Sequence, residues 1–406
     1  MSHNLNELAL YGGSPAISAP FPARKAFGPG EEQAVLAVLD YYRERDEDPC
    51  YRGPFEAQLC NAFSDYMGGG YSVAVATGTA SVYVALAALE LPAGSEVIIS
   101  PVTDAGPLNS IIMQNLVPVV ADAAPDSFNT SWPQIEKKLT EKTRCIMLVH
   151  CGGLPVADTD VIVAQARARG IKVLEDCAQA PGAKLNGQLV GTFGDIMATS
   201  TMYRKNIASP GSGGLVFCRD QDLYHSALAH SDRGKPLWSD EYVERNPAQH
   251  LFPALNWNTN DFSCAVTLAS LQRLDQTITD RTRAMTQLRE AINSHSDICN
   301  ISAWQGDPSP FFIQVKVDTS RLNVDKLEYC QALVAEGVPM NPDYKFLVAD
   351  WHWSHEHFTQ QPVTTPNATH ARDTSFNLYV NENYDASHVS MIVAAITKVD
   401  RCFRHA

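Results

Sequence analysis

The feature that most constrains the fold is an alternation of short apolar runs with helix-period segments between residues 30 and 220. Two of these segments, 31–44 and 55–67, repeat apolar residues along one helical face. Such alternation is typical of strands joined by crossover helices in a mainly parallel sheet. The sequence therefore predicts a large α/β sheet with seven strands, at 72–76, 96–99, 117–120, 145–149, 172–174, 197–201 and 214–218.

Beyond residue 220 the pattern changes. A polar, proline-containing stretch extends to about residue 260, and one long helical segment from 261 to about 293 follows it. We expect a large α/β domain over residues 1–255, which includes an N-terminal segment, and a linking helix with a small α+β domain over residues 256–406. The small domain is predicted to contain strands 311–317 and 376–380 and helices 324–336 and 386–399.

The composition excludes several classes of protein. The formal net charge is −14 and no basic run is present, so nucleic acid and anionic membrane surfaces are poor partners. No apolar run reaches the roughly 18 residues of a membrane helix, and residues 1–7 lack the features of a secretion signal. Ten scattered cysteines without a CxxC pair indicate a reducing compartment. We expect a cytoplasmic protein that binds neither nucleic acid nor a membrane.

Lys205 follows one strand-like run and precedes the glycine cluster 211–214. Upstream, Asp176 ends another strand-like run, and the small-residue turn 78–80 opens a helix. Each feature alone has a structural reading, since the turn suits a helix cap, the acid suits a cap and a lone lysine is usually solvated. In this order, the lysine, the strand-end acid and the phosphate-sized turn together suggest pyridoxal phosphate (PLP).

Amino-group transfer through PLP needs one lysine that bonds the cofactor, releases it to the substrate and then moves a proton. Lys205 suits that role. The pyridine nitrogen stays protonated when a buried carboxylate contacts it, and Asp176 lies at the strand end where open α/β sheets bind ligands. The phosphate needs N–H donors at a helix N-terminus. Gly78, Thr79 and Ala80 offer such donors, with the Ser200 hydroxyl as a further candidate.

Over nearly its whole length the chain resembles the DegT/StrS sugar aminotransferase family of fold type I PLP enzymes. The similarity rests on several ordered motifs rather than on any single match. These are 8–13 (LALYGG), 78–80 (GTA), 94–99 (GSEVII), 149–150 (VH) with Gly153 and Pro155, 175–180 (EDCAQA), 191–195 (GTFGD), 205–206 (KN), 213–214 (GG), 256–258 (NWN) and 271–275 (LQRLD).

The resemblance implies a fold type I transferase whose large domain binds PLP. It implies that Lys205 bonds the cofactor, that Asp176 contacts the pyridine nitrogen and that Gln179 lies near the ring hydroxyl or ring face. It also implies an obligate homodimer with shared active sites, in which Asn256 reaches the phosphate bound by the neighbouring subunit. The phosphate positions implied by the family are Gly78, Thr79, Ala80 and Ser200.

Two positions depart from the family pattern. Asp104 stands where relatives usually carry an aromatic residue that stacks on the PLP ring, so it either contacts the ring edge or hydrogen-bonds a substrate hydroxyl, unless the loop is aligned one residue off. Asn258 replaces an arginine, which disfavours an anionic group held at that point. The pocket around the cofactor is therefore expected to differ from that of many relatives.

Two further segments contain histidines that could belong to a site. His150 ends a strand-like run, where it either lines the site or serves as a satisfied structural histidine. The stretch 351–357 contains three histidines, but its spacing matches no familiar zinc site. We interpret it as a loop and predict no metal site.

The leading hypothesis is a PLP-dependent aminotransferase that moves an amino group from glutamate or glutamine to a keto sugar or keto cyclitol. Motif 8–13 looks most like relatives that act on cyclitols and unactivated sugars. One alternative is a PLP-dependent sugar dehydratase or aromatising lyase, although dehydrating relatives commonly replace the lysine by histidine. A second is a catalytically idle PLP-binding regulatory protein, because Asp104 and Asn258 break the pattern. A nucleotide-linked oxidoreductase is disfavoured, since segment 28–33 does not complete GxGxxG.

Overall fold

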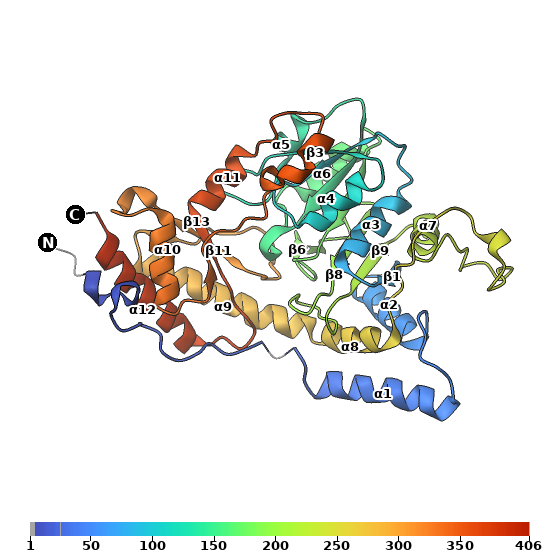
Figure 1. The fold of residues 1–406 in the computed structure, drawn as a ribbon, viewed down its shortest axis with the longest axis horizontal. Helices are drawn as coiled ribbons and strands as arrows, with labels where there is room; N and C mark the ends of the chain where they lie inside the picture. Colours follow the sequence, from blue (N-terminus) through green and yellow to red (C-terminus); the bar gives the residue numbers. More distant parts are fainter. Residues whose placement is uncertain (1–4, 25, 406) are drawn as a thin grey trace.

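The computed structural model describes residues 5–24 and 26–405. Residues 1–4, part of the segment in which we find no secretion signal, lie outside the described residues. Figure 1 shows a large sheet region and a smaller one at opposite ends of the molecule. Helix α8 (Asp261–Gln272) lies beside the large sheet region, and α9 (Leu274–His295) extends from it toward the small one.

All seven predicted strands form, and together they make one seven-stranded sheet with the order β1-β9-β8-β5-β4-β2-β3. β9 alone runs antiparallel to its two neighbours, so the sheet is mainly parallel, as predicted. Its strands are β1 (Tyr71–Val75), β2 (Glu96–Ile99), β3 (Val117–Val120), β4 (Thr143–Val149), β5 (Lys172–Asp176), β8 (Ile196–Ser200) and β9 (Gly214–Cys218).

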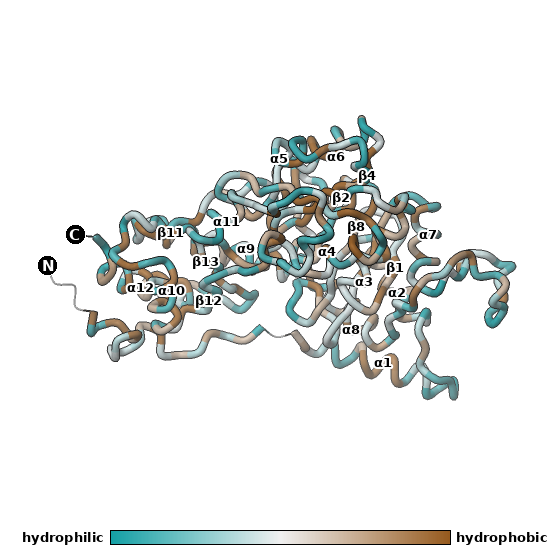
Figure 2. Tube along the Cα trace, turned by 45° about the horizontal axis from the view of Figure 1, so that its top comes forward, coloured by the Kyte–Doolittle hydropathy of each residue, from teal (hydrophilic) through white to brown (hydrophobic). Residues whose placement is uncertain are grey.

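The apolar strand residues are buried on both faces of the large sheet. On β2, Val97 and Ile99 join one hydrophobic cluster with residues of α3 (Gly78–Ala88), whereas Ile98 joins another with residues of α6 (Thr159–Arg167). This explains why the strands read as continuous apolar runs rather than alternating ones. Figure 2 shows the hydrophobic trace concentrated around β1, β2 and β8.

The second sheet has four strands in the order β10-β11-β13-β12, all antiparallel to their neighbours. The predicted strands become β11 (Ile313–Val317) and β13 (Ser375–Leu378), and the predicted helices become α10 (Lys326–Ala335) and α12 (Ala386–Phe403). The edge strands β10 (Cys299–Asn300) and β12 (Met340–Asn341) have only two residues each, so they gave no periodic signal in the sequence.

The N-terminal segment crosses from the small sheet region to the large one. Leu8 and Ile17 are buried in the same hydrophobic cluster as β11 and α12. The amides of Ala9 and Ala16 both donate to the Glu336 carboxylate, at 2.9 and 2.6 Å. The chain then runs along α9 to α1 (Pro29–Arg45), as Figure 1 shows.

The single helix predicted from 261 to about 293 is interrupted at Arg273, and that part of the prediction was wrong. Arg273 leaves helical geometry (φ −106°, ψ 8°) between α8 and α9. Its guanidinium donates to Glu31 at 2.7 and 2.9 Å and to the Ala26 carbonyl at 2.9 Å. These contacts with Glu31 of α1 and with Ala26 are long-range and leave no mark in the local helical period.

Among the described residues, no helix combines the length and apolar character needed to cross a bilayer. The other helices and strands are α2 (Pro54–Tyr66), α4 (Ala105–Ile112), α5 (Trp132–Glu136), α7 (Gln221–Ser231), α11 (Pro366–Asp373), β6 (Lys184–Leu185) and β7 (Gln188–Leu189), with 3-10 turns at Leu5–Glu7, Ala9–Tyr11, Cys151–Gly153, Pro247–Gln249, Thr319–Arg321, Val348–Asp350 and His352–His357.

Candidate active site

The carboxyl end of β8 meets the N-terminus of α3 at one edge of the large sheet. Gly78 opens α3, and a Cβ on this residue would lie 2.5 Å from Cβ of Ser200, the last residue of β8. A side chain at position 78 is therefore excluded by contact, and only glycine lets the helix approach the strand this closely. The structure thus brings together two of the positions that were predicted to bind phosphate.

The first turn of α3 provides the donors of an anion site. Thr77 caps the helix, and its Oγ1 accepts from the Ala80 amide at 2.8 Å, so Ala80 spends its N–H on the cap. Gly78 and Thr79 precede it, and first-turn amides have no acceptor within a helix. The Ser200 hydroxyl oxygen accepts from the Met202 amide at 3.2 Å, which leaves its own proton available to a ligand. Ala80 is the least suited of the predicted phosphate positions.

Asp176 ends β5, beside β8 in the sheet, and its side chain is buried. Burial raises the pKa of this carboxyl, while a 2.9 Å hydrogen bond from the Ala178 amide and the positive charge of Lys205 oppose the rise. Among the described residues, the Ala178 amide is the only hydrogen-bond donor to the Asp176 carboxylate. A desolvated carboxylate with so few partners favours a cationic N–H donor such as a protonated pyridine nitrogen.

Lys205 lies on the loop after β8, where its amide donates to the Met202 carbonyl at 2.8 Å. The side chain is half-buried, and its Nζ lies 4.4 Å from the centre of the Phe311 ring. Burial lowers the pKa of this amine, whereas Asp176, Asp104 and Cys151 counteract the shift by their charges. A lowered pKa increases the fraction of free amine near neutral pH and so favours nucleophilic attack on a carbonyl carbon.

Gln179 is held from two sides. Its Oε1 accepts from the Gly152 amide at 2.7 Å and its Nε2 donates to the Tyr344 hydroxyl at 3.3 Å. Tyr344 belongs to a chain of aromatic contacts with Phe312 and Phe346. The amide of Gln179 is therefore fixed in orientation beside the Asp176 strand end.

Asp104 is exposed and caps α4, with Oδ1 accepting from the Gly106 amide at 3.1 Å. The start of α4 touches the start of α3, since a Cβ on Gly106 would lie 2.5 Å from Oγ1 of Thr79. An acid thus stands beside the first turn of α3, at the position where relatives were expected to carry an aromatic ring. Its second oxygen is free to meet a ligand, because the cap uses only one.

Asn256 is exposed on the loop before α8. Its Oδ1 accepts from the amide and from the side chain of Asn258, at 3.0 and 2.9 Å. The neighbouring Trp257 carbonyl accepts from Ala76 at 2.8 Å, which ties this loop to the end of β1 just before the α3 turn. The predicted contact of Asn256 with a neighbouring subunit's phosphate remains a prediction.

His150 serves the fold rather than the reaction. Its Nδ1 accepts from the Val156 amide at 3.0 Å, so Nε2 carries the proton and donates to Glu175 at 3.1 Å. Glu175 also accepts three backbone amides, from residues 191, 193 and 194. His150, Glu175 and Cys177 lie close enough to hold a metal ion. The ring nitrogens of His150 and the carboxylate of Glu175, however, are already engaged in these hydrogen bonds.

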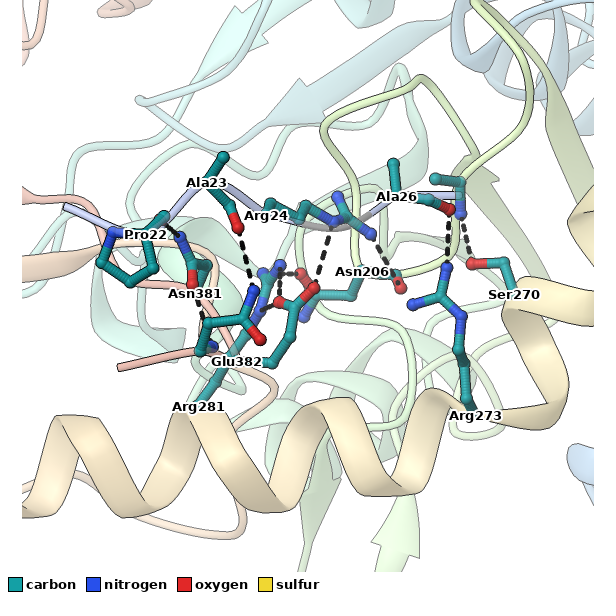
Figure 3. Close-up of polar contacts among 12 residues, drawn as sticks. Pro22, Ala23, Arg24, Ala26, Asn206, Ser270, Arg273, Arg281, Asn381 and Glu382 are labelled. Atoms are coloured by element: carbon teal, nitrogen blue, oxygen red, sulfur yellow. Dashed lines mark hydrogen bonds and ion pairs between the residues drawn. The ribbon is translucent and has the colours of Figure 1, made fainter. Parts of the chain in front are cut away.

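Sequence reasoning missed Phe311, Tyr344 and a set of polar and charged residues whose contacts Figure 3 shows. We call Arg24, Asn206, Arg281 and Glu382 the arginine cluster. No local signal marks these residues, because they come from four distant parts of the chain. Only Asn206 lies inside a motif that was noted, next to Lys205.

The residues present fit PLP. The first turn of α3 with Ser200 suits a phosphate dianion, the buried Asp176 suits a protonated ring nitrogen, and Lys205 supplies a half-buried amine near Asp176. The close approach of Gly78 to Ser200 places the start of α3 directly beside the Ser200 hydroxyl, so the helix amides and this hydroxyl can face one ligand.

Comparison with known proteins identifies relatives of this chain in sequence and in structure. A putative L-glutamine:3-amino-2,3-dideoxy-scyllo-inosose aminotransferase of Micromonospora echinospora is 28% identical over 385 residues, which cover 90% of this chain and 88% of that protein. Among solved structures, an aminotransferase from Psychrobacter cryohalolentis matches with a TM-score of 0.83 at 24% identity, covering 93% of this chain and 98% of that one.

An E. coli GDP-4-keto-6-deoxy-D-mannose-3-dehydratase, solved with bound hydrated PLP, matches with a TM-score of 0.84 at 20% identity, over 94% of this chain and 99% of that one. These likenesses establish the predicted fold class. The sequence model of the DegT/DnrJ/EryC1/StrS aminotransferase family matches residues 39–397. The chain belongs to this aminotransferase family.

Proposed function

We propose that this chain transfers an amino group from glutamine or glutamate to the ketone of a sugar or cyclitol, with PLP as cofactor. The observation that carries the proposal is the placement of Lys205 beside buried Asp176 and the α3 N-terminus at one sheet edge. The family match and the relatives support the aminotransferase class, the predicted PLP cofactor and the sugar or cyclitol acceptor.

PLP supplies an electrophilic carbonyl carbon and an electron-accepting ring. Lys205 would hold the cofactor through its amine and would yield that bond to the amino donor. The freed amine would then take a proton from one carbon atom of the donor–cofactor adduct and deliver it to another. Asp176 keeps a proton on the ring nitrogen, because a buried carboxylate is stabilised by a cationic partner. The acceptor ketone reverses these steps, so the kinetics should be ping-pong.

We propose glutamine as the first donor to test, because the Micromonospora echinospora relative is described as glutamine-dependent. Its acceptor is a cyclitol that already carries an amine. An acidic Asp104 at the edge of the site suits an acceptor with hydroxyl or amino groups better than one with an anionic group. The neutral Asn258 points in the same direction.

The deciding experiment has two parts. Purified protein should absorb as a PLP protein, and borohydride should fix the cofactor on a peptide that contains Lys205, but not in Lys205→Ala. Incubation with glutamine or glutamate alone should then convert the cofactor to its amino form in a single turnover. If no amino donor produces that conversion while borohydride still fixes the cofactor, the transferase proposal fails.

A dehydratase is the second candidate, because one of the solved structures with the same fold is a sugar dehydratase. Lys205 argues against it, since dehydrating relatives were expected to carry histidine at this position. A Lys205→His variant provides the comparison. Elimination of water from a keto sugar by the unaltered protein, without an amino group in the sugar product, would favour the dehydratase.

We further propose a homodimer with shared sites. The support is that Asn256 is exposed beside the end of β1, and that Leu251 and Leu255 on the same loop are 54% and 49% exposed. Exposed leucines of this extent suit a covered surface. Light scattering should give a dimer mass. Mixed dimers of Lys205→Ala and Asn256→Ala chains should recover part of the activity, because one of their two sites retains both residues.

Two further expectations are kept as proposals. A division at residue 255 is supported by the strands of the large sheet, which all precede it, although segment 8–17 packs on the small sheet region. Limited proteolysis tests this division. A cytoplasmic location is supported by ten unpaired cysteines, of which eight are buried. Fractionation of the producing cells tests the location.

A further inference from the structure

The amine of Lys205 lies over the face of Phe311, 4.4 Å from the ring centre. Phe311 comes just before β11, far from Lys205 in the sequence but next to it in space. The negative face of an aromatic ring attracts an ammonium group at this distance. The Phe311 ring can therefore hold the charged amine without the help of a carboxylate.

Segment 309–311, which carries this ring, is bonded on both sides. On one side the buried Asn206 donates Nδ2 to Oγ of Ser309 at 2.7 Å and to the Ser309 carbonyl at 3.1 Å. On the other side the amides of Ser309 and Phe311 donate to the carbonyls of Gly153 and Gly152, at 2.9 and 3.0 Å. The ring is thus held between the loop of Lys205 and the loop that orients Gln179.

The arginine cluster fixes the orientation of Asn206. Arg281 donates Nη1 to Oδ1 of Asn206, and its other nitrogens donate to Glu382 at 3.0 and 2.9 Å (Figure 3). Arg24 donates to the Asn206 carbonyl at 3.5 Å. Because Oδ1 faces an arginine, Nδ2 must face Ser309. The clamp on segment 309–311 therefore depends on a buried guanidinium.

The reaction places a demand on this amine that the contact meets. Once the donor has displaced Lys205, its side chain must stay within reach of the carbon atoms between which it moves a proton. The charged or titratable groups near the amine are Asp176, Asp104 and Cys151. Asp176 is committed to the ring nitrogen under the proposed function, and Asp104 is an exposed helix cap.

We propose that Phe311 is a positioning residue that holds the Lys205 amine whenever it is not bonded to the cofactor, and that Asn206 fixes Phe311 for this task. The value of this contact for the proton transfer rests on the proposed function. The contact itself, and its support by Asn206, concern the protein alone. The contact between ring and amine should therefore be measurable without cofactor or substrate.

The test of the contact uses the cofactor-free protein. Acetic anhydride labels free amines, and mass spectrometry of the peptide gives the labelling rate of Lys205 as a function of pH. The ring stabilises the charged amine, so Phe311→Leu should lower the pKa of Lys205 and raise its labelling rate at pH 8 by about two- to five-fold. Phe311→Tyr keeps the ring and should label like the unaltered protein.

Phe346→Leu is the matched control, since this ring contacts Tyr344 in the same aromatic chain and is 36% exposed. It should leave Lys205 labelling unchanged. Equal labelling of Phe311→Leu and unaltered protein overturns the proposal, as does equal acceleration in Phe346→Leu. Asn206→Ala should raise the labelling like Phe311→Leu if the clamp operates, and an unchanged rate removes Asn206 from the role.

The test of the proton transfer uses the loaded enzyme in a single turnover with amino donor deuterated at the α-carbon. Phe311→Leu should slow this step and enlarge its isotope effect, with little change in the donor concentration at half-saturation. A change in half-saturation alone contradicts the role in proton transfer. If the unaltered enzyme gives no turnover with any donor, the proposed function fails while the labelling result still decides the contact.

Discussion

The sheet edge and the arginine cluster both include neighbours of Lys205 and are built in opposite ways. At the edge, Gly78, Asp176 and Ser200 each occupy the end of a strand or the start of a helix. Parallel strands bring such positions together by geometry alone. The cluster instead joins residues 24, 206, 281 and 382, which no single motif contains.

The two regions also differ in what they leave unpaired. The edge keeps donors and a carboxylate available to a ligand, whereas most polar groups of the cluster are bonded to other protein groups. Arg24 and Glu382 are the exceptions, since Nε and Nη1 of Arg24 and Oε1 of Glu382 have no hydrogen-bond partner in the described part of the chain, although Nε of Arg24 lies 3.6 Å from Oε1 of Glu382 as an ion pair. Burial and the neighbouring Arg281 lower the pKa of Arg24 to about 10. We therefore expect the edge to take part in the reaction and the cluster to support the fold. Substitutions at the edge should mainly change catalytic rates, and substitutions in the cluster should mainly change the free energy of unfolding.

The largest effect is expected at the edge. Lys205→Ala should reduce kcat by at least about 10³-fold, because the amine is lost both as the cofactor's attachment and as the proton carrier. Its unfolding midpoint should change little, since the side chain is only half-buried. Steady-state kinetics and urea unfolding measure the two quantities. Lys184→Ala, an exposed lysine on β6, is the control and should leave both unchanged.

The cluster should show the reverse behaviour. Arg281→Met leaves the Glu382 carboxylate, whose side chain is 13% exposed, without its principal partner and should cost about 3 kcal/mol of unfolding free energy in urea. Arg283→Met, on the same helix, removes an exposed pair with Asp280 and should cost less than about 1 kcal/mol. Similar losses in the two variants would show that the cluster is no more than a surface pair.

A smaller effect should depend on pH. Burial alone raises the pKa of the Glu382 carboxyl, but the charges of Arg281 and Arg24 and the hydrogen bonds outweigh it, so the pKa is lowered. A carboxyl with a lowered pKa stabilises the fold above its unfolded pKa and loses this contribution as the pH falls through the folded value.

Glu382→Gln should therefore cost about 2 kcal/mol at pH 7 and progressively less below about pH 4.5. Urea unfolding at both pH values gives the difference. Glu47→Gln removes an exposed carboxylate and serves as the control. A cost that stays constant with pH would mean that the shape of Glu382, and not its charge, supports the cluster.

The same contrast explains how far the sequence could be read. The strands of the large sheet, Asp176 at a strand end and the α3 turn were found because each leaves a local pattern in the chain. Arg273 breaks the expected long helix through contacts with Glu31 and Ala26, which lie over 240 residues away. Phe311 and Arg281 also contact residues that are distant in the sequence, so local periodicity carried no information about their roles.

Ala80 and His150 show a second limit of the sequence. It locates a residue near the site but does not tell whether the polar groups of that residue are free to bind a ligand. The α3 turn was located, but the amide of Ala80 is taken by the Thr77 cap. The strand-end His150 was located, but both its nitrogens are engaged in the fold. Which lone pairs and N–H groups remain free depends on hydrogen-bond partners, and these are fixed only in three dimensions.

The smallest expected effect concerns Asp104, where the edge combines both kinds of role. One carboxylate oxygen caps α4 and the other is free, so two substitutions separate the roles. Asp104→Asn keeps the cap, since asparagine caps as well as aspartate, but turns a charged contact with the acceptor into a neutral one. It should lower kcat/KM for the acceptor by about two- to five-fold at unchanged stability.

Asp104→Ala should add a loss of about 1 kcal/mol in unfolding free energy. If Asp104→Asn instead destabilises the protein and leaves kcat/KM intact, this acid belongs with the supporting residues, and the edge is less purely reactive than its geometry indicates.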